Sequence, residues 1–462
     1  MKKSVWKLSI VTLVASVLFT VLPTAAATNA KVGNVGNVDT GKLAKGKIKN
    51  VILLIGDGMG PNYTTAYRYY KNDFFAKEMT PTAFDPYLVG MQTTYPDDQR
   101  ENITDSAAAA TAMATGQKTY NNAIAVDEKN RPLETVLERA KHVGKSTGLV
   151  ATSEINHATP AAFAAHNESR KNYAAIADDY YDELIDGQHT VDVLLGGGKK
   201  YFKRKDRNLV KQFRNDGYNF VTNREQLLNS SSNKVLGLFA DEGLPKAIDR
   251  GKKIPSLEEM TNAALKQLNK NENGFFLMVE GSQIDWAGHS NDVVGVMSEM
   301  KDFEQAFQAA IDFAKKDKHT LVIATADHET GGLSIGSDGA YVWNPEPIKQ
   351  VKRTPEFMAQ KIMSGEDVAA VLTKHIRFRL SDEEIQAVQK AADGGKEAAV
   401  AKTISEMIDS RTYTGWTTGG HTGVDVPVYA YGPGSERFAG LIDNTDIGKE
   451  IFSVIDKNGR RK

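Results

Sequence analysis

The sequence contains no cysteine, which excludes disulfide bonds, thiolate-bound zinc, iron–sulfur clusters and a cysteine nucleophile. It also lacks an excess of charge of either sign, since 57 Lys and Arg stand against 58 Asp and Glu, for a net charge of -1. A surface dedicated to nucleic acid needs a basic excess, so no nucleic-acid-specific binding is expected. Hydrophobic residues make up 41% and charged residues 25% of the 462 residues, which indicates a globular chain rather than a disordered or fibrous one.

The first 27 residues have the pattern of a signal peptide. Three lysines precede an uncharged apolar run at 8–22, and small residues at 25–27 predict cleavage after Ala27. The alternative is a membrane anchor, but the run is short for a span of about 20 residues. We therefore expect a protein that is secreted or associated with the cell envelope, with no stable transmembrane anchor after signal cleavage.

Residues 28–49 are rich in glycine, asparagine and lysine and predict a flexible segment before one catalytic domain at 50–462. In this domain, apolar runs precede polar or glycine-rich sequence at 51–55, 148–152, 191–195, 275–279, 321–326 and 426–431. Continuous apolar runs are typical of strands buried on both faces. Apolar residues at helical spacing in 296–314 predict a core helix between two of the strands. The expected fold class is α/β, a three-layer α/β/α sandwich with a large, mainly parallel sheet.

Residues 341–418 interrupt this alternation. They are charged and helical in pattern, as in Ser381-Asp382-Glu383-Glu384. We interpret them as a helical insertion, a crown or lid over one end of the sheet.

Acidic residues and a histidine stand where three of the predicted strands end. Asp57 follows the first strand, Glu280 follows the run at 275–279, and Asp327 and His328 follow the run at 321–326. Ligands of open α/β sheets bind outside the carboxyl ends of the strands, so these side chains are expected to meet at one edge. Taken alone, Gly56-Asp57-Gly58 is better explained as a turn.

Four histidines are candidate metal ligands as a group, because they stand beside glycines, acids or threonines in predicted loops: His157, His289, His328 and His421. Asp285 lies four residues before His289, so the two share one face of a helical turn and could hold one ion. In isolation, an exposed acid beside a surface histidine is the more common arrangement. A lone histidine in a glycine-rich loop, as at position 421, is also usually structural.

Ser106 is the candidate nucleophile. It follows Thr104-Asp105 and precedes a run of alanines, so it is expected at the first turn of a helix, where the N–H groups favour an anion. The alternative is plain helix capping. The sequence gives no histidine visibly dedicated to Ser106 as a general base, which favours a metal as its activator. Arg170 offers a fork that matches two phosphate oxygens, although a solvated arginine beside Lys171 fits the local sequence equally well.

In this order, the segments resemble the alkaline phosphatase family. The similarity extends from about residue 50 to 435 and is carried by Gly56-Asp57-Gly58-Met59-Gly60, Thr104-Asp105-Ser106-Ala107-Ala108, His157-Ala158-Thr159-Pro160, Ser169-Arg170, Glu280-Gly281, Asp285, His289, Thr325-Ala326-Asp327-His328 and Gly420-His421-Thr422. The resemblance implies an alkaline-phosphatase-like fold. It also implies metal-dependent hydrolysis of small phosphate monoesters through a phosphoserine intermediate, releasing inorganic phosphate outside the cytoplasm.

The resemblance also implies a role for each matched residue. Ser106 resembles the serine that becomes phosphorylated, and Arg170 resembles the arginine that clamps the phosphate. Two Zn²⁺ and one Mg²⁺ are the implied cofactors. The first zinc would be held by Asp285, His289 and His421, the second by Asp57, Asp327, His328 and Ser106, and the magnesium by Asp57, Thr159 and Glu280. Two such cations can stabilise the entering and leaving oxygens of an in-line displacement.

Two residues near the implied third site depart from the family pattern. Many bacterial relatives have an aspartate where this chain has His157 and a lysine where it has Trp286. Because imidazole is a softer ligand than carboxylate, His157 is expected to shift the third site from Mg²⁺ toward Zn²⁺ or Co²⁺. Without the lysine, phosphate binding is expected to be weaker. The alternative is that Trp286 only packs over a loop and His157 only bonds a neighbour.

Other functions are compatible with the same sheet architecture. One is a phosphodiesterase or another hydrolase of the superfamily, and another is a non-catalytic protein that binds metal or phosphate. Arg170 favours monoesters, because the second substituent of a diester would occupy an oxygen that the arginine needs. The intact Ser106 argues against a non-catalytic protein. The physiological substrate and the oligomeric state stay open, with a homodimer as one arrangement.

Overall fold

The computed structural model describes residues 47–459. The predicted signal peptide at 1–27 and most of the predicted segment at 28–49 lie outside the described residues, so both stay predictions. Within 47–459, no helix is both long enough and apolar enough to span a membrane.

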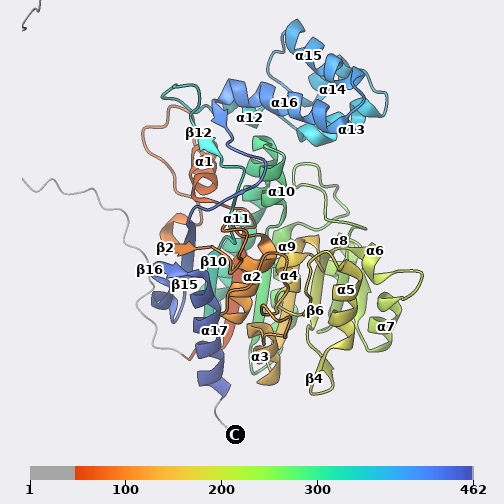
Figure 1. Ribbon diagram of the computed structural model, residues 1–462, viewed down its shortest axis with the longest axis vertical. Coiled ribbons are helices and arrows are strands. Elements are labelled where there is room, and N and C mark those ends of the chain that lie inside the picture. Colours follow the sequence, from red (N-terminus) through yellow and green to blue (C-terminus); the bar gives the residue numbers. More distant parts are fainter. Residues whose placement is uncertain (1–46, 460–462) are drawn as a thin grey trace, which may run out of the picture. The chain divides into compact units, whose positions relative to one another are not determined.

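A ten-stranded sheet forms the centre of the described chain (Figure 1). Its order is β16-β2-β15-β10-β1-β9-β3-β6-β8-β7. The strands are β1 (Asn50–Ile55), β2 (Leu88–Thr93), β3 (Ser146–Glu154), β6 (Val193–Gly197), β7 (Asn219–Val221), β8 (Val235–Leu238), β9 (Phe275–Glu280), β10 (Thr320–Thr325), β15 (Val426–Tyr431) and β16 (Gly440–Asp443). Only β15 pairs antiparallel with its neighbours, β10 and β2.

The strands predicted from apolar runs are present in the structure. They correspond to β1, β3, β6, β9, β10 and β15. Every residue of β1, β9 and β10 is buried, as expected for strands covered on both faces. Alternate residues of β1 enter two separate cores, with Ile52 and Leu54 on one face and Val51, Leu53 and Ile55 on the other. The predicted fold class is confirmed.

Four strands, β2, β7, β8 and β16, were not predicted from the sequence. β7 and β16 form the two edges of the sheet, and β2 lies next to β16. The residues of β2 and β16 are mostly half-buried or exposed, so neither segment has a continuous apolar run. β7 and β8 have only three and four residues.

Helices cover both faces of the sheet (Figure 1). The core on one face includes residues of α1 (Pro61–Lys71), α9 (Leu257–Leu268), α10 (Gln283–His289) and α11 (Val293–Asp317). The other includes residues of α2 (Ser106–Thr115), α3 (Val136–His142), α4 (Ala158–Ala161), α5 (Tyr173–Asp182), α6 (Lys199–Phe202), α7 (Leu209–Asn215) and α17 (Asn444–Gly459). Helix α11 contains the predicted helix at 296–314, and its apolar stripe is buried. Helix α8 (Arg224–Leu228) packs on α9.

Five helices occupy the predicted insertion at 341–418: α12 (Glu346–Lys349), α13 (Pro355–Met363), α14 (Val368–His375), α15 (Asp382–Asp393) and α16 (Glu397–Thr412). Ser381 and Glu384 form a reciprocal capping box that starts α15. Helices α13–α16 gather beyond α10, away from the sheet (Figure 1). Short pairs connect loops elsewhere: β4 (Leu184–Ile185) with β5 (Gln188–His189), β11 (Glu329–Thr330) with β14 (His421–Thr422), and β12 (Ser334–Ile335) with β13 (Thr414–Gly415).

His166 forms a buried ionic contact on the α3 side of the sheet. Its Nδ1 lies 3.2 Å from Glu183 Oε2, and its Nε2 lies 3.1 Å from the carbonyl oxygen of Leu133 and 3.7 Å from Glu138 Oε2. The His166 side chain is 8% exposed. Burial lowers its pKa, but the hydrogen bond to Glu183 and the charges of both glutamates outweigh burial and raise the pKa of His166 to about 9. His166 lies in an alanine-rich stretch that suggests simple packing, but the structure places it in an ion pair.

This contact predicts a pH-dependent contribution to stability. A group whose pKa is raised by folding stabilises the fold fully below its ordinary pKa of about 6.5, and that stabilisation is lost as pH rises toward about 9. The free energy of unfolding of the His166→Gln variant should be lower than that of the parent by on the order of 2 kcal/mol at pH 6, a value already reduced because Glu183 is partly exposed. This deficit should shrink by pH 9.5. Denaturant unfolding of both proteins at saturating metal measures this deficit.

The control is His142→Gln, because His142 is exposed at the end of α3, the helix that carries the partner Glu138. It should show no pH-dependent difference from the parent. A His166→Gln deficit that stays constant from pH 6 to 9.5 would show that the imidazolium charge does not contribute.

Candidate active site

Three parallel strands at the centre of the sheet deliver acids to one edge. Ile55, the last residue of β1, lies opposite Thr325 of β10 and Glu280 of β9. Asp57 and Asp327 follow two residues after β1 and β10, so the parallel register carries them to the same edge. The side chains of Asp57, Glu280, Asp327 and His328 are fully buried there, at 0% exposure. The structure therefore brings together these four residues at the expected edge.

Gly58 makes this convergence sterically feasible. Its φ is +74°, a conformation that residues with a Cβ rarely adopt. A Cβ at this position would also lie 2.8 Å from the Cα of Asp285. The Gly58 N–H donates to Asp327 Oδ1 at 3.1 Å, which ties the end of β1 to the end of β10. The turn interpretation of Gly56-Asp57-Gly58 and a role in the site are thus compatible.

Ser106 is the first residue of α2, as predicted. Asp105 is the N-cap, and its Oδ1 accepts the N–H of Ala108 at 2.9 Å. The Ser106 Oγ lies 3.1 Å from His328 Nε2 and 3.5 Å from Asp57 Oδ1. The resemblance placed Ser106 and His328 at one zinc, but the local sequence gave no sign of their contact, because the two residues are 222 positions apart.

Asp105 also positions Arg170. Its Oδ2 accepts from Arg170 Nη1 at 3.0 Å and from the N–H of Asn122 at 3.1 Å. Arg170 Nη2 lies 3.3 Å from His157 Nε2. The Arg170 side chain is 18% exposed, so the alternative of a solvated arginine is wrong. One carboxylate thus caps the helix that starts at Ser106 and orients the guanidinium beside it.

A first group of possible metal ligands consists of Asp285, His289 and His421. Both residues of the predicted pair lie on α10, with His289 Nε2 3.3 Å from Asp285 Oδ1. His421 joins them because β14 pairs with β11, with His421 opposite Thr330. Its Nε2 lies 3.2 Å from His289 Nε2 and 3.6 Å from Asp285 Oδ1.

The protons of these two imidazoles are placed by backbone carbonyls. His289 Nδ1 lies 2.7 Å from the carbonyl oxygen of Gly419, and His421 Nδ1 lies 2.8 Å from that of Thr104. A carbonyl can only accept, so each Nδ1 carries a proton. When the rings are neutral, the lone pairs of both Nε2 atoms face each other and the Asp285 carboxylate. These electron-rich atoms repel one another, and a cation bound among them would remove the repulsion.

Two further groups share Asp57 and are buried. Asp57, Asp327 and His328 form one, and Asp57, His157 and Glu280 form the other. His328 Nε2 lies 3.3 Å from Asp57 Oδ1 and 3.4 Å from Asp327 Oδ2. Several of their buried polar atoms have no hydrogen-bond partner within the described chain: Asp57 Oδ2, Asp327 Oδ2, Glu280 Oε1, His157 Nδ1 and Thr159 Oγ1. Buried atoms of this kind are costly unless a cation pairs with them, so the donor set fits bound metal.

Burial changes the pKa values of these groups in opposite directions. It raises the pKa of Glu280 and of Asp327 to about 7, and it raises that of Asp57 well above the usual range. Burial, followed by the charge of Arg170, lowers the pKa of His157 to about 3. The imidazole of His157 is therefore neutral at physiological pH, and its Nε2 faces the donor Arg170 Nη2.

The two residues that depart from the family pattern are neighbours in space. The rings of His157 and Trp286 meet edge to face, with centroids 5.7 Å apart and an interplanar angle of 77°. Trp286 also lies close to Gly243, where a Cβ would approach the indole within 2.5 Å. Tyr173 stacks on His157, with ring centroids 6.2 Å apart. These two departures from the family pattern therefore affect the same part of the site, next to the group that contains His157.

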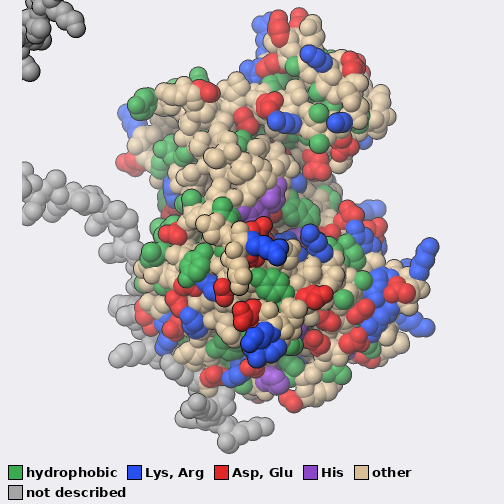
Figure 2. Space-filling model, viewed as in Figure 1, with side chains coloured by type: hydrophobic (Ala, Val, Ile, Leu, Met, Phe, Trp, Pro, Cys, Tyr) green, Lys and Arg blue, Asp and Glu red, His purple; other side chains and the backbone are tan. Residues whose placement is uncertain are grey.

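Charged side chains cluster where this site reaches the surface. Figure 2 shows histidine side chains just below the helical insertion, next to acidic and basic groups. His289 is the most exposed of the candidate ligands, with a side chain 40% exposed, whereas His328 is fully buried.

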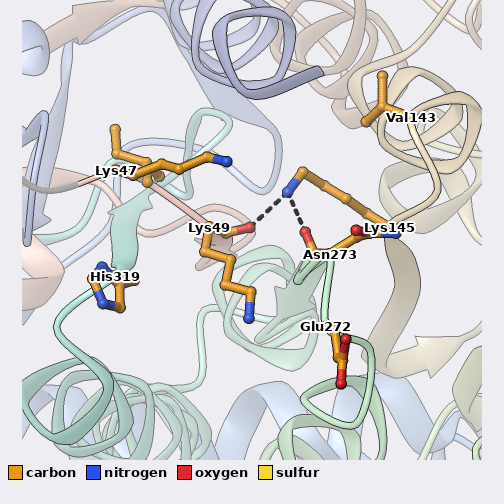
Figure 3. A pocket seen from close by; sticks show the side chains of 8 residues that line it. Lys47, Lys49, Val143, Lys145, Glu272, Asn273 and His319 are labelled. Atoms are coloured by element: carbon orange, nitrogen blue, oxygen red, sulfur yellow. Dashed lines mark hydrogen bonds between the residues drawn. The ribbon is translucent and has the colours of Figure 1, made fainter. Parts of the chain in front are cut away.

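A separate lysine-rich pocket lies at the opposite, amino end of the strands (Figure 3). Its residues directly precede β1, β3, β9 and β10, and include Lys49, Lys145 and Asn273. Lys145 Nζ donates to the carbonyl oxygens of Lys49 and Asn273, each at 2.7 Å. Burial, with the charges of Lys47 and Lys49, lowers the pKa of Lys145 to about 8. The amine ties two strand starts together and is remote from the acids at the carboxyl edge.

Comparisons with known proteins agree with this arrangement. The family model described as alkaline phosphatase matches residues 48–456. Alkaline phosphatase 3 of Bacillus subtilis (strain 168) is 59% identical over 466 residues, covering 99% of each chain. The crystal structure of a cold-active alkaline phosphatase from the psychrophile Shewanella sp. is 45% identical with a TM-score of 0.83, over 88% of this chain and 99% of that one.

A third relative concerns a metal site directly. It is the TAB5 alkaline phosphatase with one histidine replaced by glutamate and Mg bound in its M3 site. It is 31% identical with a TM-score of 0.65, over 89% of this chain and 98% of that one. The alkaline phosphatase family is metal-dependent, and the three groups of acids and histidines described above could bind metal. By the family match and these identities, the chain belongs to the alkaline phosphatase family, enzymes that hydrolyse phosphate monoesters.

Proposed function

We propose that the chain hydrolyses phosphate monoesters by transferring the phosphoryl group to Ser106 and then to water. One observation carries this assignment: Ser106 Oγ lies at the N-terminus of α2, between His328 and Asp57 of one metal group and next to the Asp105–Arg170 pair. Ser106 is 1% exposed, and every residue of the helix that it begins is buried, so access to its hydroxyl is narrow.

The residues that would hold metal follow from the three groups. Asp285, His289 and His421 would hold one Zn²⁺, and Asp57, Asp327 and His328, with Ser106, a second. Asp57, Glu280 and Thr159, with His157 alongside, would hold the third ion. When bound, such cations supply Lewis acidity that favours the ionised serine and the charge on a departing oxygen.

The chain's own groups would hold the phosphoryl oxygens. Arg170 presents a guanidinium whose Nη1 is fixed by Asp105, so the fork is oriented before substrate arrives. The N-terminus of α2 begins at Ser106, and its dipole favours negative charge there. Both contacts strengthen as charge develops on the non-bridging oxygens, which is the requirement for lowering the barrier.

Several broader properties belong to the proposal as well. The protein is exported by the signal at 1–27 and acts outside the cytoplasm, where its family members are typically found. It binds small phosphate monoesters rather than nucleic acid, and a homodimer is the proposed assembly. The third ion is Mg²⁺, with Zn²⁺ or Co²⁺ as the alternative that His157 favours.

The first prediction from this proposal concerns the nucleophile. Ser106→Ala should lower the turnover of an aryl phosphate by roughly a thousandfold or more while metal content stays unchanged, because only the attacking oxygen is removed. Acid quenching during turnover of ³²P-labelled substrate, followed by peptide mapping, should place the label on Ser106. The control Ser169→Ala changes a serine directly beside Arg170 and should keep both activity and label. Label on any residue other than Ser106 would refute the assignment.

The second prediction concerns metal removal. In the metal-stripped protein, folding raises the pKa values of Glu280 and Asp327 to about 7. As pH rises from about 4 to 7, both groups ionise more readily in the unfolded chain than in the buried site, so the free energy of unfolding falls. The melting temperature of the stripped wild type should therefore fall more between pH 5 and 8 than that of stripped Glu280→Gln. Loaded wild type should melt higher than the stripped protein at pH 8.

Differential scanning calorimetry, with metal content verified for each sample, measures both effects. An exposed substitution, Glu128→Gln, is the control and should follow the wild type. Identical pH dependence of the stripped wild type and stripped Glu280→Gln would contradict the role of buried charge.

The third prediction concerns the adjacent pair His157 and Trp286. In the TAB5 relative, a carboxylate introduced in place of a histidine accompanies Mg in the M3 site. The double variant His157→Asp, Trp286→Lys should likewise retain Mg²⁺ better, and its added lysine should tighten inhibition by inorganic phosphate. The inhibition constant of phosphate and the metal content after dialysis measure these effects. If both equal those of the parent, the two residues only pack.

A further inference from the structure

A cavity of roughly 820 Å³ lies between the site and the helical insertion. The stretch from His289 to Asp292 at the end of α10 lines one part of it, and helix α16 lines another, with Trp416 and Gly419 also contributing. This volume is in the range of small-molecule sites. Because His289 belongs to the first metal group, the cavity begins at the site itself.

The cavity lies on the open side of the site. The side chains of Asp57, Asp327 and His328 are 0% exposed, which leaves no room for a bulky group on their side. His289 is 40% exposed, and its Nδ1 contacts Gly419, which also lines the cavity. With the phosphoryl group at Ser106, the alcohol part of a substrate must extend toward solvent, and the exposed first group borders this cavity.

The cavity lining is strongly acidic. On α16, Glu397, Glu406 and Asp409 line it, and Asp292 and Glu356 contribute from other segments, against one lysine, Lys402. Lys402 is itself engaged, with its Nζ 3.7 Å from Glu406. Glu356 is paired with Lys246, whose Nζ lies 3.4 Å from it, but the acids of the lining still outnumber Lys402 and Lys246 together.

Asp409 is the most constrained of these acids. Its Oδ2 accepts from Trp416 Nε1 at 3.1 Å, while its Oδ1 is buried with no hydrogen-bond partner in the described residues. Burial and the nearby charge of Asp292 raise the pKa of Asp409 to about 8. Even with Asp409 protonated, the remaining acids outnumber the single lysine of the lining.

We propose that this cavity receives the leaving group of the substrate and that its acids select phosphate monoesters whose alcohol carries a positive charge, such as an amine or a quaternary ammonium group. The inference rests on the proposed site at Ser106. A cationic alcohol gains Coulomb attraction in the cavity, whereas an alcohol with a second anionic group is repelled. The competing explanation is that the glutamates of α16 only solubilise an exposed helix face.

The test compares two substrates that differ in charge but not in shape, together with a third that is anionic. Phosphocholine and 3,3-dimethylbutyl phosphate have the same skeleton, with N⁺ in one and carbon in the other, and 4-phosphooxybutanoate carries an added negative charge. The measured quantity is the ratio of kcat/KM for phosphocholine to that for the neutral isostere. The absolute ratio also depends on the different pKa values of the two leaving alcohols. The ratio is therefore compared between protein variants.

The variant Glu397→Gln, Glu406→Gln removes two cavity acids and leaves Lys402 unpaired. It should lower the phosphocholine ratio by roughly three- to tenfold, raise kcat/KM for 4-phosphooxybutanoate, and leave that for the neutral isostere nearly unchanged. The effect should weaken as salt is increased from 0.02 to 0.5 M, as expected for charges near the surface.

The matched control is Glu366→Gln, Glu383→Gln. Glu366 forms an exposed ion pair with Lys361, as Glu406 does with Lys402, and Glu383 lies in the first turn of α15, as Glu397 does in α16. Neither control residue lines the cavity. The control should keep the wild-type ratio.

The outcomes separate the inference from the proposed function. If the wild type hydrolyses all three esters but the cavity variant and the control share one ratio, the cavity does not select charge and the inference is wrong. If none of the esters, nor an aryl phosphate, is hydrolysed, the proposed site itself fails.

Discussion

The structure depends on the confinement of like charges at one edge of a buried sheet. The parallel register of β1, β9 and β10 leaves Asp57, Glu280 and Asp327 side by side with no exposed surface. Carboxylates in this position repel one another and lose hydration, which is why burial dominates their raised pKa values. A bound cation would relieve this repulsion, so the feature that makes the edge unfavourable by itself is also the feature that suits it to metal binding.

Much of the fold could be predicted because the central strands have a clear pattern. A strand covered on both faces must be apolar throughout, as β1, β9 and β10 are. Edge strands such as β16 need no such pattern, because their burial and pairing depend on neighbours far along the chain. The acids at the strand ends were predictable for the same reason as the strands, since parallel strands place their carboxyl ends at one edge.

The contacts that orient the site could not be predicted from the chain alone. Asp105 was recognisable as a helix cap, but its second bond to Arg170 depends on a loop 65 residues away. His421 was an isolated histidine until the pairing of β14 with β11 placed it beside His289. Its proton is fixed by the carbonyl of Thr104, in the segment that precedes Ser106. Residue types indicate which chemistry is present, whereas tertiary pairing decides which atoms meet.

The site consists of a closed inner part and an open outer part, and the two are held differently. Ser106, Asp57 and His328 lie at the ends of elements of the central sheet and its covering helix, where almost every neighbour is buried. Such packing leaves little freedom for the position of the phosphoryl group. Outward from His289, the surroundings are loops and α16, whose exposed side chains can change without disturbing the core. Under the two proposals, phosphate chemistry depends on groups held by the sheet, and discrimination among alcohols depends on the cavity that α16 lines.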